Sequence, residues 1–356
     1  MNILERYIGK TILLYIFVVL LVIMGLAGII KYVEEFRHVG KGSYDALSAA
    51  YYTVLMLPSD LENFFPVGAL IGSLLGLGTL ASNSELVVMQ SAGFSRFKIG
   101  FAVMKTAIPL MILSMVIGEW VAPQTEQFAR NMRAVAQSGG SMLATQAGFW
   151  AKDGSDFIYI RRITDEQNLN DILIYHFEER ELKSILSAEK ATFQSGNEWQ
   201  LQNVQQAVIN DEKIAQSQLA DQPWKTSITP SKLGIVSLKP ESLSISGLAD
   251  YVGFLKDTGQ DAKRFEITFW RKLYEPLAMA VMMLLAISFI FGPLRSSAMG
   301  LKIVIGVIAG FSFYVANIVF GNLTLVVSWL PVAISALIPS IVCILIVWWL
   351  LSKKRD

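Results

Sequence analysis

The sequence has little cysteine, histidine and charge. Cys343 is the only cysteine among the 356 residues, so the chain can form no disulfide within itself and no cysteine cluster for zinc. His38 and His176 are the only histidines, which excludes an H-E-x-x-H zinc motif. The formal net charge of +1 gives no basic field of the kind that binds nucleic acid.

Motifs of common enzyme classes are missing as well. No G-x-x-x-x-G-K-[ST] phosphate loop occurs, so the chain has no nucleotide-binding loop of this type. Stretches beginning at Gly93 and Gly310 start a G-x-S-x-G serine-hydrolase motif but lack its second glycine. We therefore expect no catalytic residue, no metal site and no cofactor bound by this chain.

Long apolar runs are what the sequence has instead. Hydrophobic residues make up 53% of the chain and charged residues only 17%, whereas a soluble domain is about 25% charged. A membrane-spanning helix needs about 20 mostly apolar residues. The first run has no convincing cleavage site behind it and is interpreted as a signal anchor. The six predicted spans are Thr11–Ile30, Phe64–Ala81, Ile99–Gly118, Pro276–Leu294, Ile303–Gly321 and Leu330–Leu351.

Lysines and arginines near the spans gather on one side of the predicted membrane. They stand before the first span, between spans two and three, between spans four and five, and after the sixth. The positive-inside rule then places both termini in the cytoplasm and the stretch from Val121 to Lys272 outside. The residues concerned are Arg6, Lys10, Arg96, Lys98, Arg295, Lys302, Lys353, Lys354 and Arg355.

The outer stretch changes its pattern to alternating apolar and polar residues. Such period-two segments, separated by Gly, Asn and Asp, predict short strands of an all-β module such as a sandwich or jelly roll. The segment Leu248–Gly259 is expected to be helical, with Gly259 ending the helix. The alternating segments are FIYIRRI (157–163), DILIYHF (171–177), KATF (190–193) and EWQLQNV (198–204).

The predicted fold is thus an α-helical membrane protein with six transmembrane helices, arranged three plus three, and an inserted all-β, jellyroll-like outer domain. Residues 1–121 hold the first three spans, residues 122–270 the outer domain with a connecting helix, and residues 271–356 the last three spans.

Charge is dense at the outer end of the first span, within Ile29–Lys41. On a continuing helix, residues four apart such as Lys31 and Glu35 could pair and form a salt-bridged rim. Alternatively the cations bind an anionic ligand, because the positive-inside bias disfavours them here and arginine can bind phosphate with two hydrogen bonds. The residues alone leave both interpretations open. The cations are Lys31, Arg37, His38 and Lys41.

Glycines recur every four residues in two spans. This spacing places them on one helical face and lets a second helix approach closely, so we expect packing interfaces. Asn317, in the fifth span, is expected to hydrogen-bond within such an interface. The glycines are Gly68, Gly72 and Gly76 in the second span and Gly306 and Gly310 in the fifth.

The cytoplasmic loop between spans two and three predicts its own helix, over residues 82–93. Ser82 and Glu85 match the S-x-x-E capping box, and Gly93 can end the helix in the left-handed region. The apolar residues from Leu86 to Met89 cover most of a turn, which leaves a surface for a cytoplasmic partner. A connector lying on the membrane surface is the alternative.

Two other classes of membrane protein fit the residues less well. An envelope scaffold needs neither an ordered cytoplasmic helix nor cations beside a lipid. A secondary transporter would place ionisable residues or broken helices at mid-membrane. Here Lys105 lies near the cytoplasmic edge, and no Asp or Glu is evident inside the six runs.

Several of these segments resemble the LptF/LptG permease family of the bacterial lipopolysaccharide exporter. The likeness extends from about Leu4 to Lys354. Two of the motifs, SFIFGPLR and GEWVAPQ, favour the LptG branch over the LptF branch. The motifs are LERYIGKTI, GSYDAL, SELVVMQSAGFSRFKI, VMKTAIPL, GEWVAPQ, WAKDG, SISGL and SFIFGPLR.

The resemblance implies a non-catalytic subunit of an ABC transporter in the inner membrane. An LptF-type permease would complete a heterodimer, two copies of an LptB-type ATPase would bind ATP and Mg, and an LptC-type protein would add one span. Each permease would carry a periplasmic jellyroll, and lipopolysaccharide would be extracted from the inner membrane and passed to a periplasmic bridge toward the outer membrane.

Site residues follow from the same resemblance. The helix of residues 82–93 would be the coupling helix that docks on the ATPase, through Glu85, Leu86, Met89 and Gly93. Where the family has two lysines this chain has Arg37 and His38, and an imidazole can be neutral at pH 7. The cations expected to bind lipopolysaccharide phosphates are Lys31, Arg37, His38, Lys41, Arg130 and Arg133.

Overall fold

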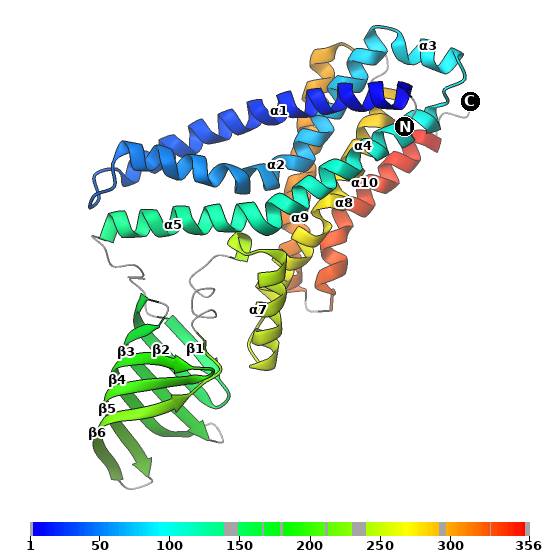
Figure 1. Ribbon diagram of the computed structural model, residues 1–356. Coiled ribbons are helices and arrows are strands. Elements are labelled where there is room, and N and C mark those ends of the chain that lie inside the picture. The colour runs from blue at the N-terminus through cyan, green and yellow to red at the C-terminus, as the bar shows by residue number, and fades with distance from the viewer. Residues whose placement is uncertain are drawn as a thin grey trace.

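The computed structural model has a helical part and a β domain attached at one end (Figure 1). Part of the charge pattern that predicts the membrane orientation lies outside the described residues, namely Arg295, Lys353, Lys354 and Arg355. The structure describes residues 3–138, 149–165, 167–178, 181–210, 213–229, 240–291, 297–327 and 329–352.

Among the described residues, six helices are long and apolar enough to cross a membrane, which confirms the predicted spans. α2 begins well before the expected Phe64, because the Asp45 side chain accepts a hydrogen bond from the Ser48 backbone N–H at 2.8 Å and caps the helix early. The third span is α4, which continues through a π-helical segment, η2, into α5. The bounds are α1 Ile3–Glu35, α2 Ala46–Ser82, α4 Arg96–Val116, η2 Ile117–Val121, α5 Ala122–Ser138, α8 Lys263–Phe291, α9 Met299–Val326 and α10 Val332–Ser352.

The predicted boundary at residue 121 therefore falls inside a continuous helix. The polar face of α5 is compatible with the end of an apolar span, and the sequence pattern alone does not show that the helix continues to Ser138. The first described strand, β1, begins at Phe149, beyond the end of this helix at Ser138, so Arg130 and Arg133 stand on a helical extension of the third span.

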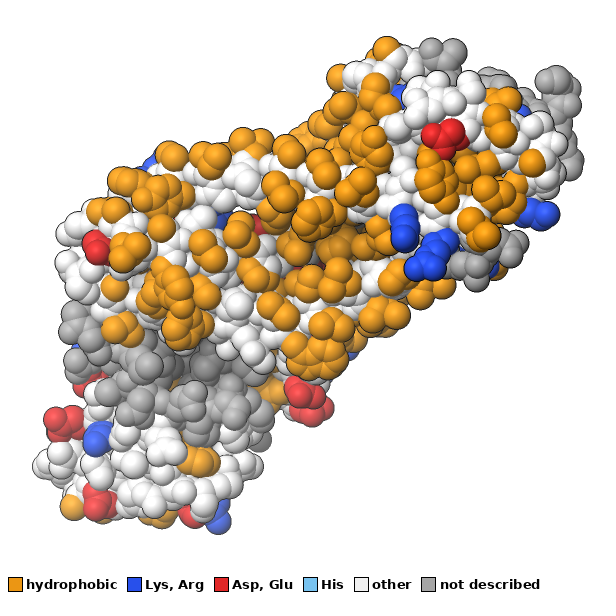
Figure 2. Space-filling view, turned by 45° about the horizontal axis from the view of Figure 1, so that its top comes forward, with side chains coloured by type: hydrophobic (Ala, Val, Ile, Leu, Met, Phe, Trp, Pro, Cys, Tyr) orange, Lys and Arg blue, Asp and Glu red, His pale blue; other side chains and the backbone are white. Residues whose placement is uncertain are grey.

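α2 and α8 form the centre of the helical part and are the most buried spans. Their side chains share one apolar core with α1, α4 and parts of α9 and α10, including Leu70, Leu74 and Met282. The outward faces of α1, α4, α9 and α10 carry exposed hydrophobic side chains, and Figure 2 shows such side chains spread over the surface of the helices. That surface suits the lipid hydrocarbon or another apolar helix.

In the part of the outer domain that the structure describes, the strands form one six-stranded antiparallel sheet. All four predicted segments lie in its strands, and inward-facing residues such as Ile158, Ile172 and Trp199 form a core separate from that of the helices. The described strands pair strictly in chain order, as in a meander, whereas the Greek keys of a jelly roll bring non-consecutive strands together. The strands are β1 Phe149–Asp153, β2 Asp156–Asp165, β3 Asn168–Glu178, β4 Glu181–Ser195, β5 Glu198–Asn210 and β6 Lys213–Lys225.

The chain returns to the membrane part through a short 3₁₀ turn, η3 (Pro240–Ser242), and α7 (Ile245–Asp257). α7 confirms the helix predicted near residues 248–259. The Ser244 side chain caps it by accepting from the Gly247 N–H at 3.1 Å, and Gly259, at φ +67°, follows its end. α7 leads directly into α8, so the sheet is connected at both ends to long membrane helices.

Candidate functional site

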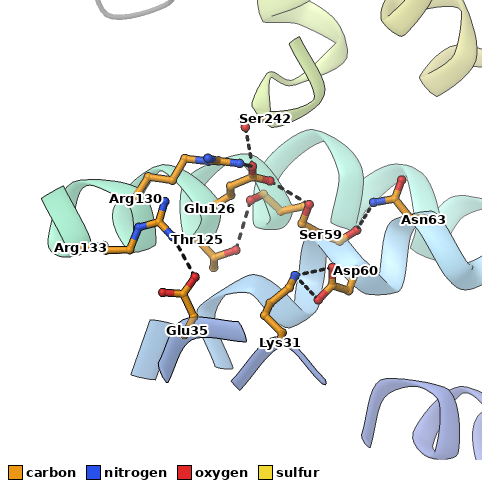
Figure 3. A network of polar contacts seen from close by, with 11 residues as sticks. Lys31, Glu35, Ser59, Asp60, Asn63, Thr125, Glu126, Arg130, Arg133 and Ser242 are labelled. Carbon is orange, nitrogen blue, oxygen red and sulfur yellow. Dashed lines mark hydrogen bonds and ion pairs between the residues drawn. The ribbon is translucent and has the colours of Figure 1, made fainter. Parts of the chain in front are cut away.

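The outer end of the helical part holds a layer of ion pairs between helices (Figure 3). Lys31 of α1 binds Asp60 of α2, with 2.5 Å between Nζ and Oδ2. Arg133 of α5 binds Glu35 at the end of α1, with 2.8 Å between Nη1 and Oε1. The expected pair within α1, Lys31 with Glu35, does not form, because each side chain has a partner on a neighbouring helix. The predicted salt-bridged rim is present, but its ion pairs join different helices and do not lie within α1.

A third acid, Glu126 of α5, connects this layer to the β domain's return segment. Its carboxylate accepts hydrogen bonds from Arg130, from Ser59 of α2 at 2.8 Å and from Ser242 of η3. Glu119, on the π-helical segment, accepts from the backbone N–H of Ile245 at 2.9 Å, at the start of α7. Carboxylates are favourable at a helix N-terminus because of its unpaired N–H groups.

Two of the predicted phosphate-binding cations are exposed. Arg37 lies in η1 (Phe36–His38), a 3₁₀ turn in which α1 ends, and Lys41 lies in the loop that follows. Neither has an ion-pair partner among the described residues. The His38 ring is half-buried, and its Nδ1 has no hydrogen-bond partner. The loop itself is held in place, because the Ser43 N–H donates to the Ala136 carbonyl of α5 at 2.8 Å.

The six predicted cations therefore separate into two groups. Lys31, Arg130 and Arg133 are compensated by carboxylates at contact distance. Arg37 and Lys41 present uncompensated charge to the surroundings, on the short segment that joins α1 to α2. An anionic headgroup can bind the second group directly, but reaches the first only in competition with the acids.

The predicted helix between spans two and three exists as α3, Glu85–Ser91, but its predicted capping box is wrong. Ser82 is the last residue of α2, and its hydroxyl donates to the Thr79 carbonyl at 2.9 Å. The N-cap is Ser84, in the left-handed region at φ 62° and without a side-chain cap bond. α2 runs one residue beyond its apolar run and includes Ser82 itself, so Ser82 is not free to cap the next helix.

The predicted end of α3 is confirmed. Gly93 adopts φ +85°, and its N–H donates to the Gln90 carbonyl, while the Phe94 N–H donates to the Met89 carbonyl at 2.9 Å. These two bonds are the Schellman motif, and the buried Phe94 and Met89 supply the apolar contact that accompanies it. Glycine is required here because the left-handed conformation strains other residues.

α3 has an inner and an outer face, which the run of four apolar residues did not distinguish. Leu86 and Met89 are buried in the core of the helical part. Val87 and Val88 point outward, and Phe97, at the start of α4, is 90% exposed. Leu86 and Met89, expected to contact the ATPase, instead hold α3 on the membrane helices. Glu85 is half-buried beside Asn83, whose Nδ2 lies 3.4 Å from Oε1.

Both glycine faces pack against helices of this same chain. Gly68, Gly72 and Gly76 lie against Leu20, Ile16 and Ile12 of α1. Gly306 and Gly310 of α9 lie against α2, where an added Cβ would come within 2.8 Å of Leu74 and 2.9 Å of Val67. The expected close packing of both faces is confirmed.

A group of buried charges was missed. Glu62 of α2 and Lys272 of α8 are 7% and 10% exposed and form an ion pair of 2.9 Å. Glu275 and Arg271 of α8 lie beside the same cavity as this pair. These four residues are called the inner charge cluster below. The expectation that no acid lies within a span is wrong, because α2 and α8 start earlier than their apolar runs and so include these residues.

The inner charge cluster borders a cavity of about 90 Å³ between α2, α8, α9, α10 and η3. Asn317 of α9 lines this cavity, whereas it was expected in a helix interface. Glu62 also lies against the π-helical segment, because a Cβ added to Gly118 would come within 2.8 Å of its Oε1. Within the described ranges, no group of three or more His, Cys, Asp or Glu could hold a metal ion.

Comparison with known proteins gives one consistent result. The family model "Lipopolysaccharide export system permease LptF/LptG" matches residues 6–353. The Haemophilus influenzae lipopolysaccharide export system permease protein LptG is 54% identical over 357 residues, covering 100% of this chain and 99% of the relative. The Escherichia coli K12 LptG is 52% identical, covering 99% of each. The Escherichia coli K12 LptF is 26% identical over 122 residues, 34% of this chain and 33% of the relative.

Proposed function

Because this chain belongs to the lipopolysaccharide export system permease family LptF/LptG, we propose that it is the LptG-type permease subunit of an ATP-driven lipopolysaccharide exporter. The observation that carries the proposal is the identity of 52–54% with LptG proteins over the full length of both chains. In this role the chain takes part in moving lipopolysaccharide out of the inner membrane toward a periplasmic bridge.

The comparisons disfavour both alternative interpretations of the sequence, an LptF-type subunit and an envelope scaffold. An LptF-type subunit is disfavoured because the LptF relative matches only a third of the chain at 26% identity. A non-transporting scaffold is disfavoured because the full-length relatives are named export permeases. The chain is a multi-pass membrane protein, with six helices in its described ranges that are long and apolar enough to span.

The proposed partners are an LptF-type permease, two copies of an LptB-type ATPase and an LptC-type protein. ATP and Mg would be bound by the ATPase. This chain would not itself hydrolyse ATP and would transmit movement from the ATPase. α3 is suited to it because Leu86 and Met89 anchor its inner face, whereas Val87, Val88 and Phe97 leave an apolar outer surface. A push on that surface reaches α2 through the buried face, and α4 follows α3 directly along the chain.

The proposed orientation follows the charges near the spans, with both termini and α3 in the cytoplasm and the β domain in the periplasm. The ion-pair layer of Figure 3 then lies near the periplasmic face. It joins α1, α2 and α5 to the return segment of the β domain through Glu126 and Ser242. The helices that border the lipid are thus linked directly to the domain that would receive the substrate.

The proposed phosphate-binding set keeps all six cations but gives them different roles. Arg37 and Lys41 are exposed and can make the first contact with an anionic headgroup. Lys31, Arg130 and Arg133 can join only if the headgroup displaces their carboxylates, which adds a desolvation cost for each acid released. His38 stands next to Arg37 in the same turn, and its unpartnered Nδ1 is available for a hydrogen bond.

Co-purification and transport test the function itself. The full chain is expressed together with its chromosomal partners and isolated through a tag on this chain. We expect a homologous permease and a P-loop ATPase to co-purify, and proteoliposomes of the complex to release lipopolysaccharide to an acceptor only with ATP. Isolation of the chain without an ATPase, or release without nucleotide, would overturn the proposal.

Photocrosslinking tests the substrate contact. A photoreactive residue is placed at position 31, 37 or 41, with Lys98, an exposed lysine on the cytoplasmic side, as the matched control. We expect lipopolysaccharide adducts from positions 37 and 41, weaker adducts from 31, and none from 98. Equal adducts from all four positions, or none in a complex that transports, would remove the cations from substrate binding.

A further inference from the structure

The inner charge cluster contains one acid without a partner. Glu62 is satisfied by Lys272, with 2.9 Å and 3.2 Å between Nζ and its two oxygens. Glu275, three residues from Lys272 on α8, forms no ion pair among the described residues, and its Oε1 is buried without a hydrogen-bond partner. An isolated buried carboxylate is so costly that such a group is normally neutral or compensated.

The elements around the cavity provide no free cation for Glu275 among the described residues. α2 contributes Glu62, which repels a second negative charge. α8 contributes Arg271, Lys272 and Tyr274, α9 contributes Tyr314 and η3 contributes Glu241, whereas α10 contributes only uncharged residues such as Ser340. Lys272 is already engaged by Glu62, and Arg271 lies beyond ion-pair distance of Glu275 among the described contacts. An ionised Glu275 would therefore share one engaged cation with Glu62.

The cavity supplies the conditions for a neutral acid. Its volume of about 90 Å³ admits several water molecules, since one needs about 10–15 Å³ of such space and two to four polar partners. Asn317, Ser340 and Thr268 offer uncharged polar groups on three of the surrounding helices. A metal ion is a poorer occupant, because Lys272 and Arg271 border the same space and repel it.

We propose that this cavity is a proton-binding site, in which Glu275 carries a proton while α2, α8, α9 and α10 are packed as seen here. The carboxylate takes its proton from a hydronium ion, leaving water, when the cavity closes. It transfers the proton back to water, forming hydronium, when the helices separate and the carboxyl group is hydrated. Helix separation and proton release are then linked, so the open form is favoured at high pH. The proposal does not depend on which substrate the permease moves.

Substitutions at the two acids distinguish this site from an ordinary buried ion pair. Glu275→Gln replaces a neutral acid by an isosteric neutral amide, so we expect the purified complex to keep its yield and melting temperature. Glu62→Gln leaves Lys272 buried and unpaired, so we expect the melting temperature to fall by several degrees. Glu266→Gln on the same helix, whose acid pairs with the exposed Lys256, is the matched control for loss of one carboxylate.

Infrared spectroscopy gives a readout that does not depend on stability or transport. The complex at neutral pH should show a protonated-carboxyl C=O band that disappears in Glu275→Gln and remains in Glu266→Gln. The melting temperature of the unaltered complex should fall at high pH more steeply than that of Glu275→Gln. A missing band, or destabilisation by Glu275→Gln equal to that by Glu62→Gln, would overturn the proposal. Restoration of stability by an added alkali cation alone would assign the cavity to a metal ion instead.

Discussion

Gly72 of α2 lies directly against the backbone of Ile16 of α1, so close that a Cβ on the glycine would come within 2.7 Å of the Ile16 nitrogen. The contact joins the first two spans over the middle of both helices. Gly76 continues it one turn further, against Ile12. Small residues allow such an approach in membranes, where the apolar solvent gives no hydrophobic drive for helices to associate.

We therefore expect Gly72→Leu to destabilise this chain itself, by about 1–3 kcal/mol for overpacking of a closely packed contact. The backbone of Ile16 cannot move aside as a flexible side chain could. Thermal unfolding of the purified complex, read from its monodisperse fraction, measures the effect. Gly100→Ala is the control, because a Cβ there meets nothing within 4 Å. If Gly72→Leu melts like Gly100→Ala, the contact is looser than described.

Arg133 and Glu35 give a second prediction, which separates stability from substrate binding. The Glu35 carboxylate is buried and receives Arg133 together with the Tyr44 hydroxyl at 3.0 Å. Arg133→Ala leaves that charge without a cation, and we expect a loss of about 3 kcal/mol, the low end for a buried pair because the arginine is partly exposed. Thermal unfolding and complex yield report it.

The double substitution Arg133→Ala, Glu35→Gln removes the orphaned charge and should recover most of that loss. Arg37→Ala, at an exposed residue without an ion-pair partner among the described residues, should leave stability unchanged but weaken lipopolysaccharide binding. If Arg133→Ala weakens lipopolysaccharide binding at full stability, then Arg133 contacts substrate and its ion pair is incidental.

The sequence predicted most of the fold because its signals are local. Apolar runs mark the spans, alternation marks strands β2 to β5, and Gly93 marks the end of α3 through its left-handed conformation. The extents of helices were predicted less well. α2 starts at Ala46 and α5 ends at Ser138, since polar helix can extend beyond an apolar run wherever caps and neighbouring helices support it.

The candidate site could be predicted only in part, because local signals are visible in the sequence and long-range contacts are not. The identity of the cations could be seen along the chain, but their partners could not. Lys31 pairs with Asp60, and Arg133 with Glu35, across 29 and 98 positions of sequence. The inner charge cluster depended on the same long-range placement, because Glu62 and Lys272 stand 210 positions apart. No pattern within one helix could indicate these contacts.

α3 gives the third prediction. Val88 is 64% exposed on the outer face, so Val88→Asp should leave folding unchanged and reduce co-purification of the ATPase several-fold, because it places a charge in an apolar contact. Leu86→Ala is the contrasting variant. It should loosen α3 from the membrane helices, at about 2–5 kcal/mol for a buried leucine, and lower the melting temperature as well. Pull-down and thermal unfolding of each variant distinguish the two faces.

Glu85→Ala is a fourth test on the same helix. Its side chain makes no cap bond, so we expect little loss of stability, and any loss of lipid-stimulated ATPase activity reports on coupling. Asn83→Ala, which removes the neighbour of Glu85 and keeps the carboxylate, is the control. ATPase activity and complex yield that both match the unaltered complex would exclude Glu85 from the coupling surface.

The last prediction concerns pH and the β domain. His176 of β3 stands opposite Asp156 of β2 in the strand register, with 2.5 Å between Nδ1 and Oδ1. The hydrogen bond to Asp156 raises the pKa of His176 above its ordinary value of 6.5, with a smaller contribution from Glu178. The pair thus stabilises the folded sheet while the ring is protonated. That contribution is complete below the unfolded pKa of about 6.5 and is lost as pH rises through the higher folded pKa.

We expect hydrogen exchange in the β2–β3 hairpin to accelerate over that window, after correction for the intrinsic pH dependence of exchange. Asp156→Asn should bring the pKa of His176 back toward 6.5 in an NMR titration and remove the additional acceleration. A His176 that titrates identically in both proteins would show that the ion pair does not hold the hairpin in solution.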